Sequence, residues 1–79
     1  MANCDSIKIK NTSGSALAIV IEPWAVEFLL PINSSCNVVS VGGVVPAVIN
    51  LEVLTGRIIC YVETEGAVYE YWQDGKLVG

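Results

Sequence analysis

Carboxylates are the side chains with which this chain could do chemistry, because its 79 residues include eight Asp and Glu and no His. Glu22 lies close to Glu27 in the sequence, and a second acidic group comprises Glu63, Glu65 and Glu70. Two carboxylates at a suitable separation form the acid and base of a glycosidase. We expect the second group to flank a turn, where exposed charges keep sheet edges soluble. A carboxylate-dependent hydrolase is therefore the weakest function that the sequence supports.

Most other catalytic chemistries are excluded by what the sequence lacks. Without histidine, neither a Ser-His-Asp nor a Cys-His nucleophile can form, and no imidazole can bind zinc or copper. Gly42-Gly43 lacks the lysine and the spacing of a phosphate-binding loop. Cys4, Cys36 and Cys60 are odd in number and widely spaced, which indicates neither a disulfide framework nor a zinc site. We expect no enzyme, no metal and no cofactor.

The segment IEPWAVEFLLP, residues 21–31, places a tryptophan between two glutamates. Because Pro23 cannot donate to a strand ladder, the strand before it should end at Glu22 and the chain should turn a corner. Trp24 at this corner either folds back over the core or points outward as an anchor for another chain. Together with the aromatic residues near the end of the chain, this segment supplies our candidate contact or ligand surface: Glu22, Trp24, Glu27, Tyr69, Tyr71 and Trp72.

The elements that must position these residues are short β-strands. Apolar residues alternate with a period of two, and turn residues recur about every 8–12 positions, which is typical of an all-β sandwich or barrel. We predict one small domain, residues 1–79, with about seven or eight short antiparallel strands. Residues 16–22 should direct Leu17, Ile19 and Ile21 to one face. Near the end, Tyr69 and Tyr71 share a face that Trp72 does not, so at least one aromatic ring should be partly exposed.

Turn signals also predict which strands are neighbours. Residues 27–32 should pair with residues 36–41 across the turn at 33–35. The later strands should form a meander joined by turns at Thr55-Gly56, Glu65-Gly66 and Gln73-Asp74-Gly75. Cys36 and Cys60 fall within strand-like runs, so we expect both to pack in the core as small apolar residues.

The charge distribution narrows the choice of partners. The net charge is −4, and the few cations, Lys8, Lys10, Arg57 and Lys76, form no basic stripe, so we expect neither nucleic acid nor anionic membrane as a partner. Residues 28–51 contain no charge, but proline, glycine, serine and asparagine interrupt them too often for a membrane span. The first residues lack the pattern of a signal peptide, from which we expect a cytoplasmic protein.

The first half of the chain resembles a pattern found in small uncharacterised bacterial proteins. It consists of Glu22-Pro23-Trp24-Ala25 with Glu27-Phe28, after a hydrophobic strand, and the similarity covers about residues 17–41. This sequence has Pro31-Ile32-Asn33-Ser34 where the pattern has a Pro-Gly turn. The resemblance implies a bacterial, cytoplasmic origin, and it implies no activity, cofactor or partner.

The apolar content indicates association. A domain of this size hides only about 60–65% of the surface of its unfolded chain, yet 53% of the residues are hydrophobic and only 15% are charged. Large exposed apolar patches mark contact sites. We therefore predict a non-catalytic β interaction module that forms a homo-oligomer. The alternative is a binder of a small apolar or sugar-like ligand, held by aromatic residues at a barrel mouth.

Overall fold

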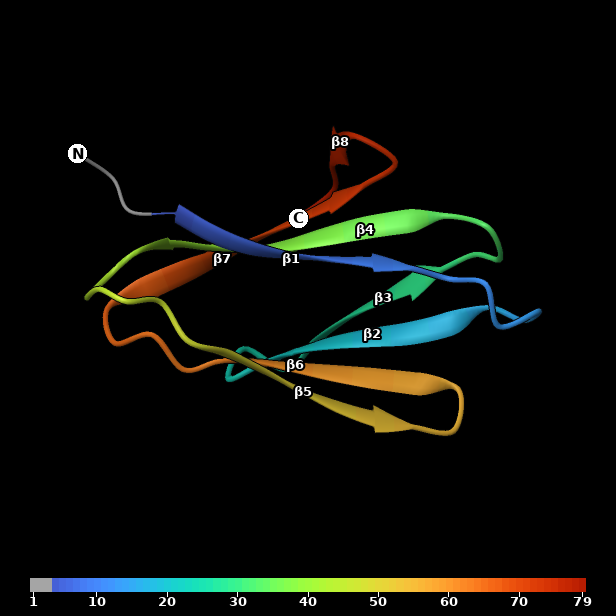
Figure 1. The fold of residues 1–79 in the computed structure, drawn as a ribbon, viewed down its shortest axis with the longest axis horizontal. Coiled ribbons are helices and arrows are strands. Elements are labelled where there is room, and N and C mark those ends of the chain that lie inside the picture. Colours follow the sequence, from blue (N-terminus) through green and yellow to red (C-terminus); the bar gives the residue numbers. More distant parts are fainter. Residues whose placement is uncertain (1–3) are drawn as a thin grey trace.

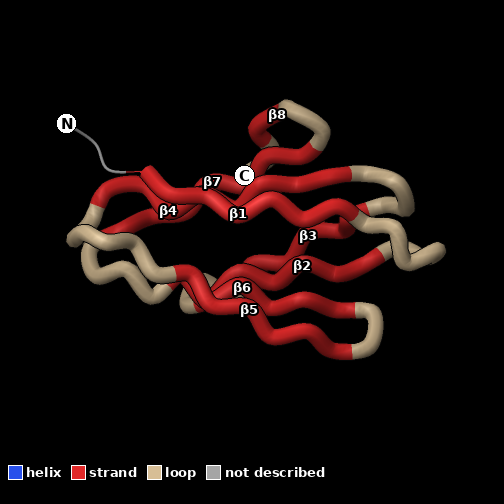
Figure 2. Tube along the Cα trace, viewed as in Figure 1, coloured by secondary structure: helices blue, strands red, loops and turns tan. Residues whose placement is uncertain are grey.

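Eight strands in two facing four-stranded sheets make up the computed structural model, which describes residues 4–79 (Figures 1 and 2). The all-β prediction is confirmed, and the architecture is a sandwich. Across residues 4–79 the structure contains no helix that could cross a membrane. The strands are β1 (Cys4–Lys10), β2 (Leu17–Glu22), β3 (Val26–Leu30), β4 (Ser35–Gly42), β5 (Ile49–Leu54), β6 (Arg57–Val62), β7 (Ala67–Gln73) and β8 (Lys76–Leu77).

The strand order is β1-β4-β7-β8 in the first sheet, sheet A, and β3-β2-β6-β5 in the second, sheet B. All pairs are antiparallel except β2 with β6, which run parallel. The predicted pairing of residues 27–32 with 36–41 is wrong, because β3 and β4 belong to different sheets. The predicted meander is wrong at Glu65-Gly66 for the same reason, whereas the hairpins at Thr55-Gly56 and Asp74-Gly75 are confirmed.

One end of the sandwich is held by Asn11, which is fully buried between two segments that pass from one sheet to the other. Its side-chain amide donates to the carbonyls of Ser15, Leu30 and Pro31 at 2.8–3.2 Å. Its Oδ1 accepts from the backbone and hydroxyl of Ser13. The two crossing segments are also joined by backbone hydrogen bonds, from the Asn11 N–H to the Ser34 carbonyl and from the Asn33 N–H to the Asn11 carbonyl. The buried side-chain amide, with its donors and acceptor satisfied, adds to this pairing.

Thr64 joins the two crossing segments at the other end of the sandwich. Its hydroxyl accepts a hydrogen bond from the Val48 backbone N–H at 2.8 Å and lies 3.2 Å from the buried Ser40 hydroxyl. Beside it Gly43 runs so close to the Glu65 carbonyl that a Cβ on Gly43 would lie 2.6 Å from that oxygen. Residues 63–66 are therefore tied to the segment between β4 and β5, so they cross between the sheets and form no hairpin.

The core lies between the sheets and follows the alternation that the sequence predicts. Ile19 and Ile21 of β2 are fully buried, and Cys36 and Cys60 are buried free thiols, as expected. Burial raises the pKa of the Cys60 thiol to about 11 and also raises that of Cys36. The remaining buried apolar residues of this cluster are Leu30, Val38, Val62 and Tyr71.

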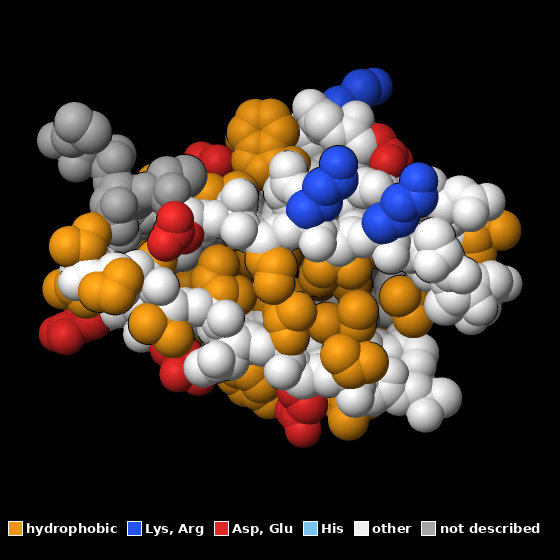
Figure 3. Space-filling view, in the orientation of Figure 1, with side chains coloured by type: hydrophobic (Ala, Val, Ile, Leu, Met, Phe, Trp, Pro, Cys, Tyr) orange, Lys and Arg blue, Asp and Glu red, His pale blue; other side chains and the backbone are white. Residues whose placement is uncertain are grey.

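The flank formed by the edge strands β1 and β5 is open. Ile49, Leu51 and Val53 of β5 lie in register with the inward-facing residues of β6, yet Leu51 is 41% and Val53 is 73% exposed. Figure 3 shows apolar side chains in a band between β1 and β5. Inner-face side chains thus reach solvent along this flank.

Candidate functional site

Trp24 occupies the turn between β2 and β3. The strand ends at Glu22, as the sequence predicts, and Pro23, Trp24 and Ala25 make the turn, with Ala25 at a φ of 58°. The Trp24 ring packs against Tyr69 of sheet A, with ring centroids 4.9 Å apart and planes tilted by 49°. Trp24 remains 36% exposed. The ring therefore folds back over one end of the sandwich and still presents about a third of its surface to solvent.

Glu22 and Glu27 both lie on the outer face of sheet B, which faces away from the core. One carboxylate oxygen of Glu22 is buried and has no hydrogen-bond partner among the described residues. The exposed Glu27 carboxylate lies 3.6 Å from the guanidinium of Arg57. With its side chain 57% exposed, the Glu27 carboxylate lies on an open part of this face.

Tyr61 brings further acidic groups to the same outer face. Its hydroxyl donates to the Glu52 carboxylate at 2.9 Å. This hydrogen bond raises the pKa of Tyr61, and partial burial and the charges of Glu52, Glu22 and Glu63 add to the effect. Within residues 4–79 no group of three or more Cys, Asp and Glu is arranged to hold a metal ion. The outer face of sheet B is thus a negatively charged surface around a tyrosine.

Tyr71 is part of the core. It is fully buried and stacks on Phe28 of the opposite sheet, with centroids 4.0 Å apart and an angle of 6° between the rings. Its hydroxyl donates to the Gln73 side chain at 3.0 Å. Burial is the main reason why the pKa of Tyr71 is raised well above its usual range. Tyr71 joins the two sheets and offers no surface to a partner.

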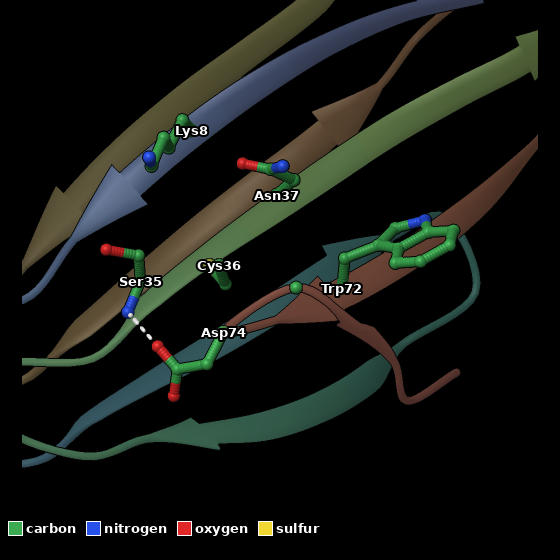
Figure 4. A pocket seen from close by; sticks show the side chains of 7 residues that line it. Lys8, Ser35, Cys36, Asn37, Trp72 and Asp74 are labelled. Atoms are coloured by element: carbon green, nitrogen blue, oxygen red, sulfur yellow. Dashed lines mark hydrogen bonds between the residues drawn. The ribbon is translucent and has the colours of Figure 1, made fainter.

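Trp72 lies on the opposite face of β7, as the alternation predicts. Its indole N–H donates to Glu70 at 3.0 Å, which fixes the ring against the outer face of sheet A. The ring borders a groove of about 420 Å³. Figure 4 shows Asn37 between Lys8 and Trp72, with Ser35 and Asp74 along one side of the groove.

The structure therefore does not bring the candidate residues together at one site. Trp24 and Tyr69 lie at one end of the sandwich, Tyr71 lies inside it, and Trp72 lies outside sheet A. The two glutamates belong to the outer face of sheet B. A barrel mouth lined by all of these residues does not exist in a sandwich.

The structure shows two further candidate binding surfaces, which the predicted residues did not include. One is the exposed inner side of β5, with Leu51 and Val53. The other is the polar part of the Trp72 groove, to which Lys8, Asn37 and Asp74 contribute. For β5 the only sequence signal was the apolar surplus. For the polar part of the groove there was none, because its residues come from two strands and a turn that only the fold brings together.

Comparisons of the chain with family models, with curated proteins and with solved structures find no match.

Proposed function

We propose that this protein is a non-catalytic β interaction module that associates with a second copy of itself through the edge of β5. The observation that carries the proposal is the exposure of Leu51 and Val53, whose positions face the inner side of sheet B. Removing apolar side chains from water is the main driving force of association. A partner on this flank would cover surface that the sandwich leaves open.

The edges of the sheets differ in how they discourage association. Edge strands are commonly protected by lysine, by proline or by being very short. β1 carries the exposed Lys8 and Lys10, and β8 has only two residues. β5 has six residues and contains neither lysine nor proline. Its edge is less protected than these two, and an apolar row runs beside it. The fourth edge strand, β3, also lacks lysine and proline, but its inward-facing residues Val26, Phe28 and Leu30 are partly or fully buried.

The backbone of β5 is suited to pairing. The Glu63 N–H donates to the Val48 carbonyl, so in the antiparallel ladder that follows, Asn50, Glu52 and Leu54 are the residues that bond to β6. Ile49, Leu51 and Val53 then direct their N–H and C=O groups toward the free edge. These same residues carry the inward apolar side chains, so one strand offers both hydrogen bonds and apolar contacts.

A two-fold arrangement would pair the free backbone groups of this edge without placing like charges opposite each other. An antiparallel β5 pair centred on Leu51 sets Glu52 opposite Asn50 of the second copy and Val53 opposite Ile49 of the second copy. The apolar rows of the two copies would then form one continuous row. Sheet B would extend across the dimer, and both open flanks would be covered.

The proposal is tested by light scattering over a dilution series of the native chain and of two matched variants. Val53→Lys places a charge on the proposed interface. Val68→Lys makes the same change at a valine that is 58% exposed on the outer face of sheet A, away from β5. We expect the native chain and Val68→Lys to reach twice the 8.4 kDa of one chain, and Val53→Lys to stay a monomer.

Two results would contradict the proposal. A native chain that is monomeric at every concentration would exclude self-association. A native dimer that survives in Val53→Lys would show that the copies meet through another surface. Circular dichroism of both variants checks that each keeps its β-sheet signal.

The alternative function, binding of a small ligand, is favoured by one observation, the groove beside Trp72. Its polar lining supports a sugar-like ligand over an apolar one.

A further inference from the structure

The groove on the outer face of sheet A is built on rigid elements. The strand register places Lys8, Asn37 and Trp72 in one row across β1, β4 and β7. The turn that follows β7 closes one side: the Asp74 carboxylate accepts from the Ser35 N–H at 3.0 Å, and the Asp74 N–H donates to the Ser35 carbonyl at 2.9 Å. The groove therefore keeps its shape without a ligand, because strands and a doubly bonded turn form it.

Several polar groups of this groove have unused hydrogen-bonding capacity. Among residues 4–79 no hydrogen bond or ion pair involves the side chain of Lys8 or of Asn37. Within the same residues, only one of the two carboxylate oxygens of Asp74 has a hydrogen-bond partner. The groove is thus lined by an ammonium group, a carboxamide, a carboxylate and an indole ring, with Asn37 between Lys8 and Trp72 (Figure 4).

We propose that this groove binds a pyranose ring. The C–H face of a sugar packs on an aromatic ring, while its hydroxyls both donate and accept, as Asn37, Lys8 and Asp74 require. One cation and one anion offset each other here, so the groove does not select a strongly charged ligand. A single aromatic ring among polar groups does not form a binding site for an apolar ligand. The volume of about 420 Å³ is within the range of small-molecule sites, about 300–1,000 Å³.

This site is independent of the proposed dimer. The Trp72 groove lies on the outer face of sheet A, and the β5 edge belongs to sheet B. Either proposal can fail while the other stands. The Val53→Lys variant allows the groove to be measured in a form in which association through β5 is blocked.

The test uses the fluorescence of Trp72. Trp24→Phe leaves Trp72 as the sole tryptophan, because the chain has two, and it keeps an aromatic ring against Tyr69. This variant is titrated with methyl β-D-glucopyranoside, methyl β-D-galactopyranoside and methyl α-D-mannopyranoside. Sorbitol, which has hydroxyls but no ring face, is the control. We expect a saturable change in emission with at least one glycoside and none with sorbitol.

Adding Asn37→Ala to this variant should weaken binding by roughly three- to tenfold, the usual effect of losing one hydrogen bond. In the native chain, the glycoside should shift the NMR signals of the Trp72 indole N–H and the Asn37 amide, and leave those of Val53 unchanged. No saturable change with any glycoside would overturn the proposal. So would equal responses to sorbitol, or equal affinity with and without Asn37→Ala.

Discussion

One flank of the sandwich is closed and the other is open. Between β3 and β7, Phe28 stacks on Tyr71, and the end of the chain covers this pair: Tyr71 exchanges backbone hydrogen bonds with Val78 and Gly79, and Gly79 lies against the Phe28 ring. On the open flank, neither β1 nor β5 contains an aromatic residue. The inner residues of β5 remain exposed there. The chain thus concentrates its large inward-facing rings on one flank, and the other flank is left with aliphatic residues that a partner could cover.

The largest effect should come from opening the closed flank. Tyr71→Ala removes a fully buried ring that joins both sheets, and we expect it to lower the free energy of unfolding by about 3–5 kcal/mol. Urea denaturation followed by circular dichroism measures the change. Val68→Ala, at an exposed position of the same strand, is the control and should change the value by less than about 0.5 kcal/mol. Equal losses would mean that the stacked pair does not hold the flank.

The second-largest effect should come from alkaline pH, which should lower the free energy of unfolding. The pKa of Cys60 rises from 9.0 to about 11 in the folded protein, so the neutral thiol is favoured there. This contribution is complete below pH 9 and is lost as the pH rises toward 11, at a cost of about 2–3 kcal/mol. Urea midpoints at pH 8, 9.5 and 11 measure it. Cys60→Ala should show a shallower decline, although Cys36 and Tyr71, whose pKa values are also raised, still contribute. An unchanged decline would contradict this assignment.

The Trp24 corner should have a smaller effect. Trp24→Ala removes the contact with Tyr69 but takes away a ring that is already partly exposed, so we expect a loss of about 1–2 kcal/mol. The molar mass in solution should not change, because the corner is separate from β5. A shift in molar mass with Trp24→Ala would move the association surface to the corner.

The smallest effect on folding should be found on the open flank. Val53→Ser alters a side chain that is 73% exposed, so the unfolding free energy of the monomer, measured at high dilution, should change by less than about 0.5 kcal/mol. The same variant should show weaker association at high concentration. A large loss of monomer stability would mean that Val53 is packed within its own chain.

Much of the local structure could be predicted from the residues. Alternation placed Ile19 and Ile21 on the buried face, Pro23 predicted the end of β2, and the turns at Thr55-Gly56 and Asp74-Gly75 are hairpins. The turn at Glu65-Gly66 also has glycine in second place but crosses between the sheets, because Thr64 and Gly43 fix it to a segment far away in the sequence.

For the candidate site, the division between what the sequence predicts and what the tertiary structure decides is sharper. The sequence by itself determined the all-β class, the faces of the strands and the lack of imidazole chemistry, because these depend on residue type and on a period of two. Only the tertiary structure decided which strands became edges and which side chains met. Leu51 and Val53 follow the same alternation as Ile19 and Ile21, yet β2 lies inside its sheet and β5 at its edge. A period-two pattern specifies the face of a residue and not the neighbour that covers it, and that neighbour is set by contacts distant in sequence.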